Sequence, residues 1–284
     1  MAKQFYKTGL VTVLLTALIS GCVNLKHVYN FSSSSLVAVT KFEDIDYSFK
    51  QSCLDKCREK KIYELNINTN DCDCRANDKA DSITLLIYSA VKGYFIGLTS
   101  LSHNELTNYK TDALNNALTE GDFGSLKIDK THVEAYSNIS KILLKAFTDN
   151  YRQRKIKTYI KGADKSISVL IRFLDFNLSE NLIGKLNVKK ERIKSYYFDL
   201  TQDTSLTTNA KRKYVEEYYS IMQAIETKQM ELLTYSKALK QIAEGHQKMV
   251  ESSDKLNTKD IKEQLTQYAG NIKDIESEFN KVKK

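Results

Sequence analysis

The chain contains no proline in 284 residues, and this absence constrains its fold more than any other feature. Proline interrupts helix interiors because it lacks the backbone N–H and clashes with the preceding turn. Glycine is also sparse, at 10 residues, whereas the helix-favouring residues Ala, Leu, Glu, Lys and Gln are abundant. The alternation typical of strands is missing apart from a short Leu65-x-Ile67 stretch. The sequence therefore predicts an all-α protein, an elongated bundle of about six long helices.

Apolar periodicity and breaker residues place the helices. We expect them at about 35–61, 78–119, 131–161, 165–200, 207–252 and 258–283. The third begins with Thr131-x-x-Glu134, a capping-box pattern, and Gly162 can end it, while the fourth can break near Gly184. The sixth has heptad spacing of coiled-coil type, with apolar residues at Ile261, Leu265, Tyr268, Ile272, Ile275, Phe279 and Val282. We expect this stripe to pack against the rest of the bundle.

The segment 83–101 carries one charged residue, Lys92, and is otherwise apolar or weakly polar. Ser89, Gly93 and Gly97 form a row of small residues four apart, which allows a second helix to approach closely in lipid or in water. Lys92, the hydroxyl groups and the two glycines disfavour insertion into a bilayer. We expect a central buried helix, and the alternative is a membrane-inserting segment.

The first 22 residues have the layout of an export signal. Lys3 and Lys7 form a basic start, and an apolar run over 10–19 follows, too short to span a bilayer. The run ends in Ile-Ser-Gly-Cys at 19–22, which resembles the lipobox of bacterial lipoproteins: an aliphatic residue and two small ones before an invariant cysteine. The resemblance covers only these 22 residues.

The resemblance implies a diacylglycerol on the sulfur of Cys22, cleavage before Cys22 and an acyl chain such as palmitate on the new amine. The bilayer would then be a partner through these chains. Val23, in place of the Asp that retains such proteins at the inner membrane, points to the outer membrane, with the body facing the periplasm or the surface. The expected organisation is a signal peptide at 1–21, a lipidated tether at 22–34 and a helical bundle at 35–284 that ends in the heptad helix 258–283.

Four further cysteines cluster within about 22 residues, which in an exported protein predicts two disulfides. Cys53 and Cys57 lie one helical turn apart, and Cys72 and Cys74 can staple the loop 62–74 back onto that helix. Pairing Cys53 with Cys74 and Cys57 with Cys72 suits an antiparallel return, but three connectivities are possible. The competing hypothesis is a zinc site with four cysteine ligands, which an oxidising compartment disfavours. Asp71-x-Asp73 resembles a fragment of a calcium loop without its glycine and closing Glu.

A search for chemistry finds no common catalytic or phosphate-cradling motif. His27, His103, His132 and His246 are solitary in the sequence and are expected at the surface or its boundary. The sequence therefore predicts no catalytic residue, no metal site and no cofactor. An export signal, and basic residues that are not interleaved with aromatics, argue against a nucleic-acid partner.

Two aromatic clusters remain, Tyr196-Tyr197-Phe198 and Tyr218-Tyr219. They are either exposed binding anchors or, as we favour, half-buried helix positions. The expected function is that of a non-enzymatic interaction or structural protein of the envelope with a protein partner. The alternatives are a membrane-inserting protein that uses 83–101 and an envelope enzyme that acts on cell wall or lipid.

Overall fold

The computed structural model describes residues 25–67, 72–103, 129–148 and 152–283, and within these ranges all regular structure is helical. The α-helices are α2 (Lys26–Thr40), α3 (Phe49–Tyr63), α4 (Arg75–His103), α5 (Lys130–Thr148), α6 (Arg152–Phe176), α7 (Ile183–Gln202), α8 (Thr208–Glu251) and α9 (Lys259–Val282). A 3-10 helix, η1 (Lys41–Asp44), follows α2, and a π-helix, η2 (Asn177–Leu182), joins α6 to α7. The predicted fold class, an elongated all-helical bundle with a disulfide-stapled region, is confirmed.

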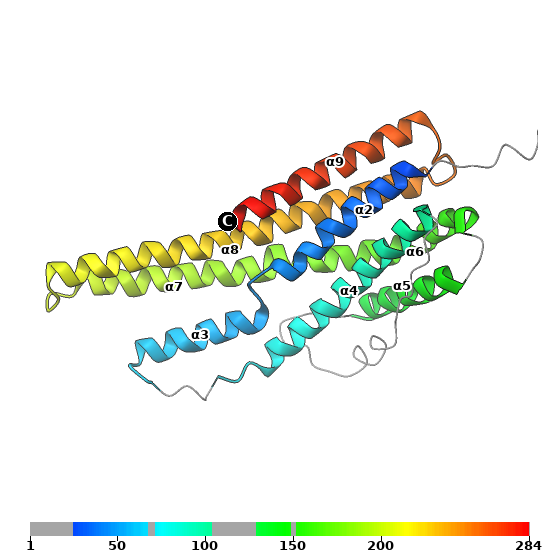
Figure 1. Cartoon of the computed structure of the whole chain (residues 1–284). Coiled ribbons are helices and arrows are strands. Elements are labelled where there is room, and N and C mark those ends of the chain that lie inside the picture. The colour runs from blue at the N-terminus through cyan, green and yellow to red at the C-terminus, as the bar shows by residue number, and fades with distance from the viewer. Residues whose placement is uncertain (1–24, 68–71, 104–128, 149–151, 284) are drawn as a thin grey trace, which may run out of the picture.

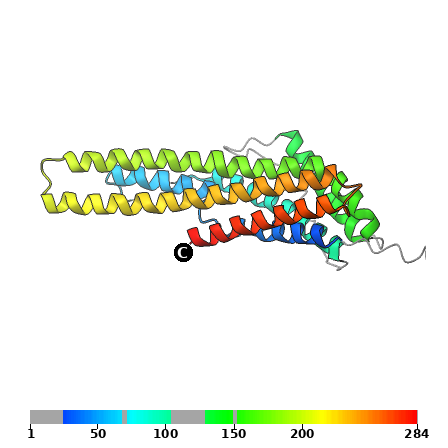
Figure 2. The ribbon, with the colours of Figure 1, turned by 90° about the horizontal axis from the view of Figure 1, so that it is seen from above.

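A long helical hairpin forms the spine of the molecule. The helices α6, η2 and α7 run on without interruption, and α8 returns antiparallel beside them (Figures 1 and 2). Thr207 begins α8, and its hydroxyl accepts a hydrogen bond from the backbone N–H of Ala210 at 3.3 Å. Since α8 has 44 residues, it is about 66 Å long. The helix α9 then folds back along the other end of α8 and places its heptad stripe against α8 and α2.

The helix α4 lies at the centre of the core, against α2, α5 and α6. Val91, Tyr94, Phe95 and Leu98 have no exposed surface. The central buried helix expected over 83–101 is therefore present. By length and composition alone, α4 is the one helix in the described ranges that could cross a membrane, and 61% of its most apolar window is buried inside this fold.

The predicted N-terminal organisation, a tether at 22–34 followed by one helix at about 35–61, is wrong in both parts. Residues 26–34, assigned to a tether, belong to α2, and Val28 and Phe31 are fully buried in the core, so the bundle begins before residue 35. The serines that suggest a linker are packed as well: Ser32, Ser34 and Ser35 are buried, and their small side chains allow neighbouring helices to come close.

The helix expected over 35–61 is also interrupted, because the chain becomes extended at Ile45 and restarts at α3. The restart is capped twice. The Ser48 hydroxyl accepts from the N–H of Gln51 at 3.2 Å, and the Asp81 carboxylate of α4 accepts from the N–H groups of Phe49 and Lys50 at 2.8 and 2.9 Å. One of these caps comes from 32 residues away, which local sequence cannot reveal.

Other boundaries shift by smaller amounts. The helix α6 passes through Gly162, and α5 is capped by Asp129, whose carboxylate accepts from the N–H of His132 at 3.1 Å, in place of Thr131. The irregularity expected near Gly184 is the π-helix η2 just before it. Residues 104–119 of the second predicted helix lie outside the described residues.

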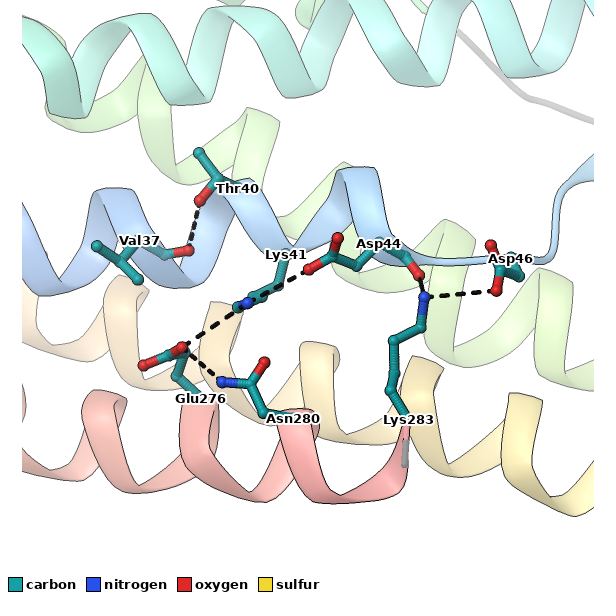
Figure 3. A network of polar contacts seen from close by, with 8 residues as sticks. All are labelled: Val37, Thr40, Lys41, Asp44, Asp46, Glu276, Asn280 and Lys283. Carbon is teal, nitrogen blue, oxygen red and sulfur yellow. Dashed lines mark hydrogen bonds and ion pairs between the residues drawn. The ribbon is translucent and has the colours of Figure 1, made fainter.

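A polar network fixes the C-terminal end of α9 to the break after α2 (Figure 3). The ammonium of Lys283 donates to the carbonyl of Asp44 and pairs with Asp46 at 3.4 Å, while Lys41 lies 3.3 Å from Asp44 and 3.8 Å from Glu276. Exposed pairs of this kind contribute little individually, and several together fix the register between the two elements.

Candidate interaction surface

Two disulfides hold the chain that leaves α3. Cys53 pairs with Cys74 and Cys57 with Cys72, with Cα atoms 5.8 and 5.9 Å apart. The disulfide prediction is confirmed, in the connectivity that suits an antiparallel return, and the zinc hypothesis is wrong because all four sulfurs are consumed. Asp73 is engaged by Arg75, whose hydrogen bonds lower the pKa of that carboxyl to about 2.

The turn after α3 is strained and apolar. The N–H of Asn66 donates to the carbonyl of Lys61 at 2.8 Å, and that of Leu65 to Ile62 at 3.2 Å, which is a Schellman helix end. This motif puts Leu65 in the left-handed region at φ 52°, where glycine is the usual residue. The disulfides and this hydrogen-bonded end present four large apolar side chains to solvent: Ile62 at 58% exposure, Tyr63 at 76%, Leu65 at 91% and Ile67 at 96%.

A groove of about 710 Å³ continues this turn between α3, α7 and the first half of α8. Ile62 and Tyr63 line it from α3. The other apolar and aromatic lining residues are Ile193, Tyr196, Tyr197, Leu200, Tyr214 and Ile221. Four tyrosine rings form a row in which each ring contacts the next, with ring centroids 5.3 to 5.8 Å apart: Tyr196, Tyr197, Tyr218 and Tyr219. We call the exposed turn and this groove the distal surface.

Two ion pairs position α3 beside α7. Lys189 lies 2.7 Å from Asp55, and Arg192 lies 2.7 Å from Glu59. The two carboxylates are 11% and 18% exposed, so they are screened less by solvent than the other surface pairs. These contacts hold α3 against α7 along the groove, whose lining includes Glu59 and Arg192 beside the apolar and aromatic side chains.

The aromatic clusters divide between the two roles considered for them. Tyr197 is 7% exposed, and burial, followed by the nearby Glu217, raises the pKa of its hydroxyl to about 12. Phe198 and Tyr219 are 62% and 67% exposed. The preference for half-buried positions therefore holds for Tyr196 and Tyr218. Tyr197 is buried more deeply than expected, and the preference fails for Phe198 and Tyr219, which are exposed.

The N-terminal start of the described chain lies at the opposite end of the molecule. Leu25 is buried beside Ile156 of α6 and Leu256 of the α8–α9 turn, whereas the distal surface lies toward the α7–α8 turn (Figures 1 and 2). We call the region of Leu25, the start of α6 and the α8–α9 turn the proximal end. The part of α8 that follows Ile221 separates the two ends.

The remaining predicted positions do not converge on one site. Cys22 lies outside the described residues. His27 and His246 are buried, contrary to the expected boundary positions, and the Nε2 atom of His246 is 2.7 Å from the Tyr94 hydroxyl. His132 packs against Phe173 and pairs with Asp129. Within the ranges that the structure covers, no three His, Cys, Asp or Glu side chains gather as a metal site would require.

Sequence reasoning missed the distal surface as a unit. The available signal was four large apolar residues, at 62, 63, 65 and 67, inside a disulfide loop where polar residues are usual. Comparison with known proteins adds no relative, because the chain matches no protein-family model, no curated protein and no solved structure.

Proposed function

We propose that this protein is a lipid-anchored, non-enzymatic protein of the bacterial envelope that presents the distal surface to a protein partner. The observation that carries the proposal is the set of four exposed apolar side chains on the turn after α3, within the loop that the two disulfides close. Contiguous exposed apolar surface is uncommon on proteins that act alone, and it marks binding sites. Its position far from the N-terminal end suits a body anchored at one end and recognised at the other.

The chemistry of the surface favours a protein as the partner. Tyrosines offer large, stiff apolar faces together with a hydroxyl that can hydrogen-bond, and such residues dominate protein interfaces. The rim carries both signs of charge, with Lys56, Lys60, Glu191 and Glu217 around the groove. A partner that inserts one or two apolar side chains into the groove and places polar groups at this rim fits the surface.

The location is proposed from the lipobox at 19–22 and is supported by the disulfides, which form in oxidising compartments. Val23 favours the outer membrane. Metabolic labelling with a fatty-acid analogue tests the anchor: the native chain should be labelled, and Cys22→Ala should not. An unlabelled native chain would refute the lipid anchor and with it the proposed membrane location.

The binding role is tested by photo-crosslinking in cells. A photoreactive residue at position 63, which is 76% exposed and belongs to both the turn and the groove, should capture one protein, and the same residue at Thr266, exposed on α9, should capture none of it. In the position-63 background, Ile67→Asp should abolish capture without loss of helical content, and the captured protein, once purified, should bind the native chain directly. Equal capture at 63 and 266, or capture unchanged by Ile67→Asp, would refute the distal surface as the binding site.

A further inference from the structure

The proximal end contains a depression of about 330 Å³ beside the first turn of α9. Its polar lining comes from Lys157 of α6 and from the α8–α9 turn: Ser253, Asp254, Lys255, Asn257 and Thr258. The two lysines and the one carboxylate leave the lining with a positive charge, and Asp254 is already paired with Lys157 and, at 3.0 Å, with Lys161.

The first turn of α9 lacks a side-chain cap. Thr258 occupies the N-cap position with an extended backbone, but its hydroxyl donates to the carbonyl of Lys255 at 3.0 Å and does not accept from the helix N–H groups. The helix has 24 residues, so its N-terminus carries the partial positive charge of a full macrodipole. Uncapped N–H groups at such an end favour an anion.

An independent observation points to a ligand at the same place. Ser253 is 5% exposed and lines the depression, and its hydroxyl oxygen has no hydrogen-bond partner among the described residues. A buried hydroxyl without a partner is rare in folded proteins, because its hydrogen bonds to water have been given up. The hydroxyl oxygen itself has less than 1 Å² of accessible surface, so a ligand in the depression would reach it through a small shift of the α8–α9 turn.

The position of the depression indicates where such an anion would come from. Leu25 lines it and stands three residues after Cys22, and three residues span at most about 11 Å. If Cys22 carries lipid, as proposed above, the phosphate layer of the bilayer lies within reach of this depression. We propose that the depression binds the phosphate group of an anionic phospholipid such as phosphatidylglycerol, and so holds the proximal end of the bundle against the membrane.

The test uses the full chain in a non-ionic detergent and measures the rise in the temperature of unfolding with added ligand. Short-chain phosphatidylglycerol should raise it, and the matching diacylglycerol, which lacks the phosphate, should not. Ser253→Ala and Lys255→Gln should each weaken the apparent affinity for phosphatidylglycerol by about tenfold, the loss of one charge-assisted hydrogen bond. Lys211→Gln, at the far end of α8, should leave it unchanged.

Three outcomes would overturn the proposal. Phosphatidylglycerol and diacylglycerol could have the same effect, or both site variants could bind phosphatidylglycerol as the native chain does. Inorganic phosphate or glycerol phosphate could also saturate the site at lower concentration than the lipid, which would assign it to a soluble phosphate ester. Fatty-acid labelling separates this proposal from the anchor. A native chain that carries no acyl label and still binds phosphatidylglycerol would refute the anchor and leave the phosphate site standing, and Cys22→Ala, which cannot be lipidated, should bind the lipid as the native chain does.

Discussion

At the scale of single residues, Leu65 has a backbone conformation that lowers the stability of the protein at an exposed position. An L-residue in the left-handed region costs about 1–2 kcal/mol, which glycine avoids at the expense of a more flexible unfolded chain. Since the side chain of Leu65 is 91% exposed, little packing offsets this cost. Leu65→Gly should therefore stabilise the protein by roughly 0.5–1 kcal/mol in urea unfolding, and it should weaken capture of the partner.

Leu65→Ala is the matched control, because it removes the apolar side chain and keeps the left-handed backbone strain. It should leave the free energy of unfolding within about 0.5 kcal/mol of the native value and reduce capture as much as Leu65→Gly does. A Leu65→Gly protein that is no more stable than Leu65→Ala would show that the turn is not strained.

His246 is buried among Tyr94 of α4, which hydrogen-bonds it, and Asp164 of α6, whose nearer oxygen is 3.8 Å away. Desolvation lowers the pKa of its imidazole from 6.5 to about 3, so the folded protein holds it neutral. The unfolded chain therefore takes up a proton first as pH falls below 6.5. Stability should drop by about 1.4 kcal/mol for each pH unit between 6.5 and 3 from this group alone.

The comparison variant for this acid sensitivity is His246→Gln, which does not titrate and can still hydrogen-bond Tyr94. Its free energy of unfolding, measured from pH 6.5 to 5 to stay above the titration of most carboxyls, should fall less steeply than that of the native chain. His27 keeps part of the slope, since burial also lowers its pKa. Identical slopes in the two proteins would contradict the buried neutral imidazole.

At the scale of helices, Gly245 sets how closely α8 approaches its neighbours. A Cβ atom there would overlap the ring of Phe31 of α2 and lie 3.1 Å from Tyr268 of α9. Gly245→Ala should therefore destabilise the protein by about 1–3 kcal/mol through overpacking. Gly270→Ala on α9 is the matched control, since its Cβ would meet nothing within 4 Å. It should stabilise by about 0.5–1 kcal/mol through helix propensity, and equal effects in urea unfolding would refute the close crossing.

The sequence predicts best the helices in which apolar residues recur every three or four positions along the whole length of the helix. The steps of three and four from Ile261 to Val282 and along 207–252 mark α9 and α8 to within a residue or two. The break between α2 and α3 was missed because Asp81 of α4 caps α3 from a distant part of the chain. The start of α2 was missed because Ser32 and Ser35 look like a linker and are core positions.

At the scale of the whole molecule, the two disulfides could be predicted from the sequence, and the distal surface could not. Cys53 and Cys57 share one helix face, so pairing them with Cys74 and Cys72 suited an antiparallel return, but the sequence left all three connectivities of four cysteines open. The groove needs α3, α7 and α8 together, and their neighbourhood depends on the pairs of Lys189 with Asp55 and of Arg192 with Glu59, more than 130 residues apart. No local pattern encodes that contact.

The same long axis gives a prediction for the anchored protein. If Cys22 carries the proposed lipid, Leu25 lies within about 11 Å of the membrane surface, and α8 alone extends about 66 Å from there. In vesicles with a fluorescent lipid acceptor, a donor dye at position 257 should transfer energy strongly, and one at position 205, in the α7–α8 turn, should transfer little. Cys22→Ala should reduce transfer at 257. Equal transfer at both positions would mean that the bundle lies along the bilayer, and the apolar turn at 62–67 would then contact lipid in place of a protein partner.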